Sequence, residues 1–242
     1  MINVVRQKQT PESLNKVEIQ TYIQEAILHL EDPNRNAKPK KTEAYRNADV
    51  LDAFDRDFYS KCYLTEKQFV NSYTMDIDHF IPQNERPDLV YEWNNLFPIE
   101  HYTNMIKPRK TPDGGLLDPC DPNDDVETEI LYFLFDLGYE PQFKPKDPNN
   151  IKAKNTCYLL TRVHNGHDDN TKKGTKELRH GIRKRYREVL DKISDWKRYE
   201  EGTVKKNLVK NELKNLLSRK SSFTMLIRST PAVRQLPDGF LD

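Results

Sequence analysis

Apolar side chains recur at helical spacing in several stretches of the chain. Residues 17–30 place apolar side chains three and four positions apart, which predicts an amphipathic helix. Thr42 is a candidate N-cap for a second helix. The buried face of that helix should comprise Val50, Leu51, Phe54 and Phe58. Residues 155–163 favour a short helix.

Two longer apolar stripes predict helices over residues 176–198 and 204–217. The first stripe consists of Leu178, Ile182, Tyr186, Val189, Leu190, Ile193 and Trp196, and the second of Leu208, Val209, Leu213, Leu216 and Leu217. The apolar run at 130–135 ends at a glycine-containing turn and is followed by residues 139–144. Its aromatic content favours a β-hairpin, with a short buried helix as the alternative.

Polar breaks divide the chain into segments. Residues 31–41 contain two prolines, and Gly114-Gly115 precedes the cluster DPCDPNDD; both read as loops. We expect an α+β, mostly helical fold in four parts: an N-terminal helical part (1–58), a central core (59–111), a linker with the hairpin (112–160), and a basic C-terminal helical part (161–242).

Composition indicates a globular protein of a reducing compartment. The 242 residues are 32% charged and 10% aromatic, and aromatic side chains can anchor a core. No run of 18 apolar residues occurs, and the N-terminal stretch lacks an apolar signal core. Cys62, Cys120 and Cys157 are odd in number and widely spaced, which argues against a disulfide framework. We therefore expect a soluble, cytoplasmic protein without a membrane partner.

The net charge of +1 conceals an asymmetry. Residues 1–150 contain 17 Lys/Arg and 27 Asp/Glu, a balance of −10, while residues 151–242 contain 22 and 11, a balance of +11. This pattern is typical of a basic limb for nucleic acid beside an acidic lobe. The competing interpretation is that the two halves attract each other, and charge alone does not separate the two.

The most informative stretch joins an acid, a histidine and downstream amides. Asp78 and His79 are adjacent and precede Pro82, so a strand should end near them. Asn104 and Lys107 are three apart, on one helix face. A neutral imidazole can deprotonate water, and the oxygens of Asp78 and Asn104 suit Mg²⁺ or Mn²⁺. Lys107 can hold a phosphate.

This order of residues resembles the HNH endonuclease family, whose ββα-metal finger ends in N-L-x-x-L-C-x-x-C-N-x-x-K. The segment from Asn95 to Lys107 reads NLFPIEHYTNMIK. It aligns with this pattern without a gap, and the two cysteines are the motif positions that differ. The resemblance implies that His79 is the general base and Asp78 the first metal ligand. It further implies that Asn95 pins the loop and orients the base, and that Asn104 is the final ligand.

The chain departs from the family at the structural zinc. Many members hold zinc with two C-x-x-C pairs, and the corresponding positions here are Cys62, Thr65, Glu100 and Thr103. One cysteine cannot complete a tetrahedral site. We expect no structural zinc, with packing or hydrogen bonds in its place.

Alternatives exist for several of these residues. His101 lies one helical turn before Asn104 and is a rival ligand or a phosphate contact, while Asp76 is either an extra ligand or a residue that shapes the local field. The stretch 163–169 (VHNGHDD) could form a second metal site, but Asn-Gly and Asp-Asp favour a turn. Isolated histidines and an Asn-x-x-Lys pair are also ordinary on polar helix faces.

A more specific resemblance extends beyond the finger. It rests on His79-Phe-x-Pro82, Tyr91-x-x-Asn-Asn-Leu96, the segment 116–119 and the basic helical end with Ser222-Phe-Thr224. Through these motifs the chain is also similar to PtuB-type HNH proteins of Septu and retron-linked antiphage systems. This implies an SMC-related, PtuA-like ATPase partner. It also implies DNA, or alternatively tRNA, as the substrate.

The basic C-terminal part suggests a nucleic-acid surface. Its candidates are Arg179, Arg183, Lys184, Arg185 and Arg187, which would neutralise phosphates without reading sequence. A solvated helix face is the alternative. Three functions stay open at this point: an HNH nuclease within an ATPase complex, a DNA-binding or assembly subunit whose finger is only structural, and a free-standing restriction or homing nuclease.

Overall fold

The computed structural model describes residues 1–242 except 8, 41, 43, 72–73, 135–139 and 167–171. Its fold is α+β, as expected, with about half of the chain helical and two small antiparallel sheets. The elements in chain order are α1 (Val17–Glu31), α2 (Ala48–Phe58), β1 (Asp76–His79), β2 (Leu96–Ile99), α3 (His101–Ile106), α4 (Val126–Glu129), β3 (Ile130–Phe133), β4 (Gln142–Pro145), α5 (Ile151–Asn165), α6 (Lys172–Arg198), α7 (Val204–Leu217), α8 (Thr224–Arg228) and α9 (Pro231–Arg234).

Most of the predicted helices are present. α1 and α7 match the predicted ranges closely, and α6 begins four residues earlier than expected. α5 is longer than predicted because Asn150 caps it, accepting a hydrogen bond from the Ala153 backbone N–H at 3.1 Å. Among the described residues, no helix combines the length and apolar character needed to span a membrane.

Thr42 does not cap a helix. α2 begins at Ala48, after a 3₁₀ turn at Ala44–Arg46. The backbone N–H of Thr42 instead donates to the Tyr91 hydroxyl, which in turn donates to the Thr42 carbonyl, both at 3.0 Å. The predicted inner face of α2 is nevertheless correct, since all four of its apolar residues are buried.

The predicted hairpin is confirmed. β3 and β4 pair antiparallel, with Tyr132 opposite Phe143, while the turn between them lies outside the described residues. The Phe143 ring contacts Tyr132 at 5.8 Å and His164 of α5 at 4.8 Å between centroids. The hairpin is thus packed on α5, and the helical alternative for this segment is wrong.

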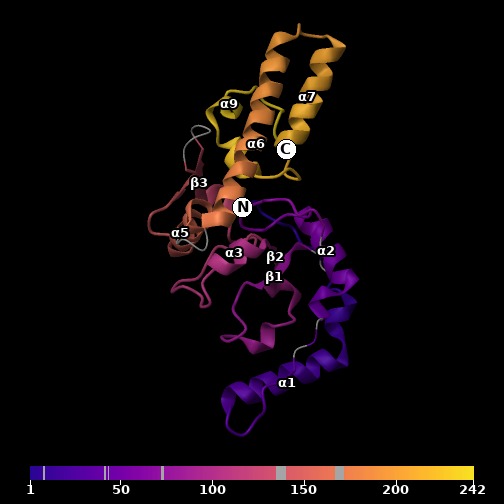
Figure 1. The fold of residues 1–242 in the computed structure, drawn as a ribbon, viewed down its shortest axis with the longest axis vertical. Coiled ribbons are helices and arrows are strands. Elements are labelled where there is room, and N and C mark those ends of the chain that lie inside the picture. The colour runs from indigo at the N-terminus through magenta and orange to yellow at the C-terminus, as the bar shows by residue number, and fades with distance from the viewer. Residues whose placement is uncertain (8, 41, 43, 72–73, 135–139, 167–171) are drawn as a thin grey trace.

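The molecule is elongated, with the β1–β2 pair and α3 near its middle (Figure 1). α1 lies at one end, and α6 and α7 pack side by side at the other. Leu208, which belongs to the predicted apolar stripe of α7, is 58% exposed, because at about 100° per residue it lies on the side of the helix opposite Leu217. Leu213 and Leu217, closer to the body, are buried.

An aromatic cluster supports the central strands. The Phe97 ring of β2 contacts Phe58, Tyr63 and Phe80 at centroid distances of 5.8, 4.8 and 5.2 Å. The Arg6 guanidinium lies 4.3 Å from the Phe97 ring centroid and donates to the Leu96 carbonyl at 2.7 Å. A cation–π interaction of a desolvated guanidinium contributes about 2 kcal/mol of stabilisation. The N-terminal segment therefore stabilises β2 through Arg6.

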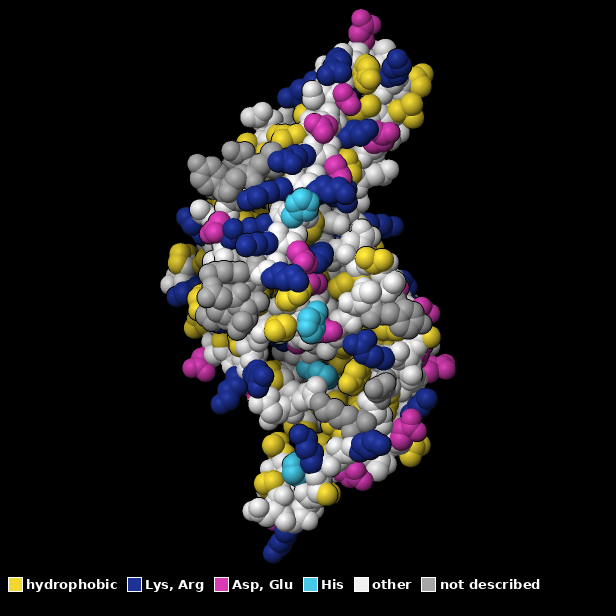
Figure 2. All heavy atoms as spheres, in the orientation of Figure 1, with side chains coloured by type: hydrophobic (Ala, Val, Ile, Leu, Met, Phe, Trp, Pro, Cys, Tyr) yellow, Lys and Arg dark blue, Asp and Glu magenta, His cyan; other side chains and the backbone are white. Residues whose placement is uncertain are grey.

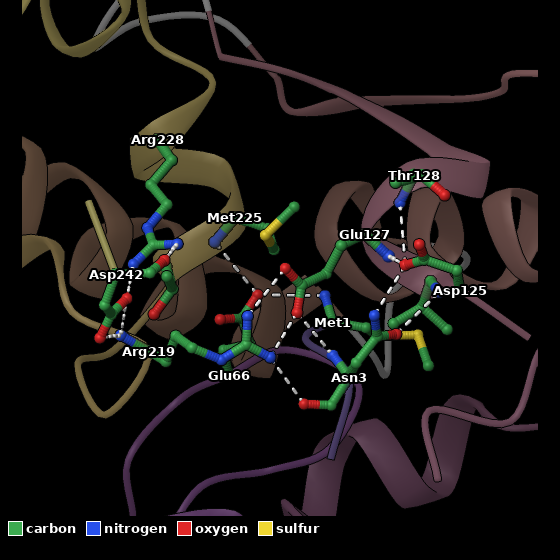
Figure 3. A network of polar contacts seen from close by, with 12 residues as sticks. Met1, Asn3, Glu66, Asp125, Glu127, Thr128, Arg219, Met225, Arg228 and Asp242 are labelled. Carbon is green, nitrogen blue, oxygen red and sulfur yellow. Dashed lines mark hydrogen bonds and ion pairs between the residues drawn. The ribbon is translucent and has the colours of Figure 1, made fainter. Parts of the chain in front are cut away.

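A polar network joins the two ends of the chain (Figure 3). Arg219 pairs with Glu127 at 2.6 Å and donates to the Asn3 carbonyl at 2.8 Å. The Asn3 amide donates to Asp125 at 2.7 Å, and Arg228 pairs with Asp242. Glu127, before residue 150, thus pairs with Arg219, after it, so part of the charge asymmetry serves an internal contact.

We predict that His164 makes stability depend on pH. It is 1% exposed, its Nδ1 lies 2.8 Å from the Leu160 carbonyl, and burial lowers its pKa to about 4. An unfolded histidine titrates near ~6.5, so unfolding takes up a proton between these values. The free energy of unfolding should fall by about 1.4 kcal/mol per unit as pH drops from ~6.5 to ~4.

Urea unfolding at pH 7.5 and 4.5 measures this effect. His164→Leu should lose less stability between the two pH values than the wild type, because the variant has no group to protonate there. Equal losses in both proteins would contradict the assignment.

Candidate active site

The β1–β2 pairing brings the candidate residues together. Asp78 pairs with Phe97, and His79 with Leu96, so both polar residues stand at the end of a strand backed by the aromatic cluster. α3 follows β2 directly because Glu100 caps it, its carboxylate accepting from the Thr103 N–H at 3.0 Å. The local order is therefore strand, strand, helix, with the polar residues of β1 beside α3.

Protein groups fix the orientation of the His79 ring. The side chain is buried, with Nε2 2.9 Å from the Val90 carbonyl and Nδ1 2.9 Å from the Gln83 amide nitrogen. A carbonyl only accepts, so Nε2 carries the proton in the neutral ring. Nδ1 is then the basic nitrogen, and Gln83 donates to it. No pattern in the sequence marks Gln83.

Asn95 holds together the loop between β1 and β2. Its side-chain oxygen accepts from the Ile81 N–H at 2.7 Å, and its amide donates to the carbonyls of Ile81 and Leu89, each at 3.1 Å. Asn95 is buried. The carbonyl that orients His79 belongs to Val90, the residue after Leu89, so Asn95 also positions the base indirectly.

Asp78 is a buried carboxylate with two strong donors. Its Oδ2 accepts from the Tyr63 hydroxyl at 2.8 Å and from the Lys107 ammonium at 2.6 Å. Burial, followed by the charge of Asp78, raises the pKa of Tyr63 well above its usual value, so the phenol stays a donor. Among the described residues, no hydrogen bond falls on the other oxygen of Asp78. Tyr63 carried no signal in the sequence.

Lys107 turns inward. Besides Asp78, its ammonium donates to the carbonyls of His79 at 2.8 Å and Phe80 at 3.3 Å. These three acceptors match its three protons, and only 6% of its side chain is exposed. The phosphate contact expected of Lys107 stays a prediction, and it would require these bonds to be exchanged.

Asp76, His101 and Asn104 form a second polar group on the same side. Oδ2 of Asp76 accepts from the Asn104 amide at 3.1 Å and lies 3.0 Å from Nδ1 of His101. Asn104 is therefore bonded to Asp76 rather than to Asp78. With its nitrogen committed, the Asn104 oxygen is the atom left to face a ligand. Carboxylates that orient ligands in this way are common around protein-bound metals.

These residues line one cavity of about 780 Å³. Its walls include Asp76, Asp78, His79, Asn104 and Lys107. Gln83, His101 and Arg109 lie along the same walls. The geometry thus places a histidine with a defined basic nitrogen, two carboxylates and an amide around one open space.

The donor set suits a hard divalent ion. Mg²⁺ commonly takes one or two carboxylates and fills its remaining positions with water and phosphate oxygens. Among the described residues, no three His, Cys, Asp or Glu side chains gather as a metal-binding group on their own. Metal binding here would therefore depend on the Asn104 amide oxygen together with Asp78, while Asp76 orients Asn104 through its hydrogen bond.

The positions that correspond to the family's zinc ligands are held by other contacts. Cys62 is buried and forms no disulfide, and its sulfur has hydrogen bonds with Thr65 and with the Glu100 backbone. The Glu100 carboxylate also accepts from the Thr103 hydroxyl at 3.2 Å. Lys67 approaches Glu100 at 3.4 Å. Hydrogen bonds thus occupy these positions, and the expected absence of structural zinc stays a prediction. The second metal site considered at 163–169 falls partly outside the described residues.

The structure divides the basic residues of α6 into two groups. Arg179 pairs with Glu140 at 2.6 Å and Arg185 with Glu188 at 3.2 Å, so both serve internal contacts. Arg183, Lys184 and Arg187 are exposed. Among the described residues, none of these three forms an ion pair with an acidic partner.

Comparison of the chain with models of protein families, with curated proteins and with solved structures finds no match.

We predict that Asn95→Ala destabilises the fold and loosens the loop at 80–91. The substitution leaves partly buried backbone groups of Ile81 and Leu89 without the partner that Asn95 supplies, at a cost of about 1–3 kcal/mol in unfolding free energy. Asn94→Ala is the matched control, because Asn94 is exposed. Chemical denaturation with hydrogen exchange would report both effects, and equal stability of the two variants would contradict this role.

Proposed function

We propose that the chain is a metal-dependent HNH-type endonuclease that hydrolyses phosphodiester bonds of DNA. The observation that supports this most is the state of His79. Its Nε2 is committed to the Val90 carbonyl at 2.9 Å, which leaves Nδ1 as the proton acceptor, and the ring borders the cavity shared with Asp78 and Asn104. A base, a carboxylate and an amide oxygen are the groups that such chemistry needs.

In this proposal His79 takes the proton of the attacking water. For Nδ1 to do so, the Gln83 amide must yield its place at 2.9 Å to that water. The Val90 carbonyl then stabilises the positive charge that develops on the ring, because it accepts the hydrogen bond that Nε2–H donates. Asn95 keeps this carbonyl in position through Leu89. General-base catalysis of this kind contributes about 10²- to 10⁴-fold.

Asp78 and Asn104 would hold the divalent ion, with Asp76 orienting Asn104. When bound, the ion stabilises negative charge on the phosphate and the leaving oxygen. Lys107 affects metal binding at this site, because its ammonium lies 2.6 Å from the Asp78 carboxylate and neutralises its charge. A dication and this ammonium compete for the same carboxylate. Release of Lys107 would also free it for the scissile phosphate.

The resemblance to PtuB-type proteins further suggests an antiphage complex with an SMC-related ATPase. Exposed cations on α6 would add affinity for phosphates without sequence preference. Target choice would then come from the partner, which distinguishes this proposal from a free-standing restriction nuclease.

One observation favours a second candidate, a finger that only maintains structure in a DNA-binding or assembly subunit. Lys107 and Asp78 form a buried ion pair, with side-chain exposures of 6% and 9%. In such a pair Lys107 compensates the buried charge of Asp78, so the finger would need no metal to be stable. Loss of one partner from a buried pair costs about 3–5 kcal/mol, so Asp78→Ala is a poor test of catalysis, since the variant risks unfolding.

His79→Ala separates the two candidates. With supercoiled plasmid and Mg²⁺ or Mn²⁺, the wild type should cut, and the variant should lose at least about 100-fold in rate while keeping its fold by circular dichroism. His29→Ala is the control, because His29 belongs to α1 and lies outside the cavity. Equal cleavage by wild type and His79→Ala would refute the nuclease assignment.

A further inference from the structure

One face of α6 carries a row of basic side chains. Lys176, His180, Arg183 and Arg187 follow one another at intervals of four, three and four residues, and all four are exposed. At 3.6 residues per turn these positions fall on a single face of the helix. We call this set the α6 stripe.

The rest of the helix explains why this face is open. The buried residues of α6 lie on the opposite side: Leu178, Ile182, Tyr186, Val189 and Ile193. Arg179 and Arg185 flank that buried side and are paired. Within the described part of the chain, no acidic side chain pairs with a member of the stripe.

The helix that carries the stripe begins beside α3 of the candidate active site. At Gly174, an added Cβ would lie 2.4 Å from Cγ of Tyr102, so the α6 backbone rests directly on a side chain of α3. Lys176 follows two residues later, and α3 carries His101 and Asn104 of the cavity wall. Figure 1 shows this end of α6 beside α3. Figure 2 shows Lys and Arg side chains over α6 and histidines on the same face of the molecule.

We propose that the α6 stripe binds the phosphate backbone of double-stranded DNA and aligns it with the cavity at α3; this rests on the proposed nuclease function. From Lys176 to Arg187 the helix rises about 16 Å, several times the 3.4 Å of duplex axis that each phosphate of one strand occupies. The row is therefore long enough to contact several phosphates of a duplex rather than one isolated phosphate.

The chemistry of the stripe favours duplex over single strand. Proteins that bind single strands add aromatic platforms on which bases stack. The aromatic residues of α6 do not offer one, since Tyr186 is buried and Trp196 packs against Phe240 at 5.0 Å between ring centroids. A straight row of basic side chains without an aromatic stacking platform instead fits the regular backbone of a duplex and reads no sequence.

Charge reversal of the stripe tests the proposal. Arg183→Glu/Arg187→Glu is compared with Lys205→Glu/Lys214→Glu on α7, which reverses two exposed lysines and changes the net charge by the same amount. Binding to a 20-base-pair duplex is followed by fluorescence anisotropy in EDTA across a range of NaCl concentrations. Circular dichroism checks that both variants are folded.

The stripe variant should bind the duplex at least about tenfold more weakly, and the dependence of log affinity on log salt should be shallower by about 2. The α7 control should stay within about twofold of the wild type. Equal affinity of the two variants would overturn the proposal. An equal loss on a 20-nucleotide single strand would overturn the assignment of a duplex.

The two proposals fail separately. If wild type cuts plasmid and His79→Ala does not, while the stripe variant binds DNA normally, the stripe is wrong and the nuclease stands. If neither wild type nor His79→Ala cuts, yet duplex binding depends on the stripe, the DNA surface stands and the nuclease does not.

Discussion

The pairing of β1 with β2 is the constraint on which the site depends. It places Asp78 opposite Phe97 and His79 opposite Leu96, so two polar residues are anchored to one of the most buried parts of the molecule. A slip of one residue in this register would exchange the faces of β1. The aromatic cluster around Phe97 and the Arg6 guanidinium oppose such a slip, and Asn95 closes the loop that connects the strands.

Sequence patterns were sufficient where local periodicity governs structure. The range of α7 follows directly from its apolar spacing, and the pairing of β3 with β4 from an aromatic run before a turn. Thr42 was misread because its partner, Tyr91, lies 49 residues away, beyond any capping pattern. Leu208 is apolar like its buried neighbours in α7, but it lies about 180° around the helix from Leu217 and is therefore exposed.

The same distinction applies to the site. Their chemistry, together with the resemblance to the HNH finger, predicts that Asp78, His79, Asn104 and Lys107 share one site, and all four line the cavity. The sequence does not reveal which acceptor each donor would choose, because that depends on how α3 lies against β1. The Lys107–Asp78 pair, the Asp76–Asn104 bond and the contributions of Tyr63 and Gln83 are consequences of tertiary packing, and no local motif encodes them.

The central claim is that Asp78 and Asn104 together hold a catalytic divalent ion. Anomalous diffraction from crystals soaked in Mn²⁺ tests it most directly. If the claim holds, a single strong peak should lie about 2.0–2.2 Å from an oxygen of each residue, with the Lys107 ammonium withdrawn from Asp78. A crystal that takes up no Mn²⁺ there, with Lys107 still bonded to Asp78, would contradict it.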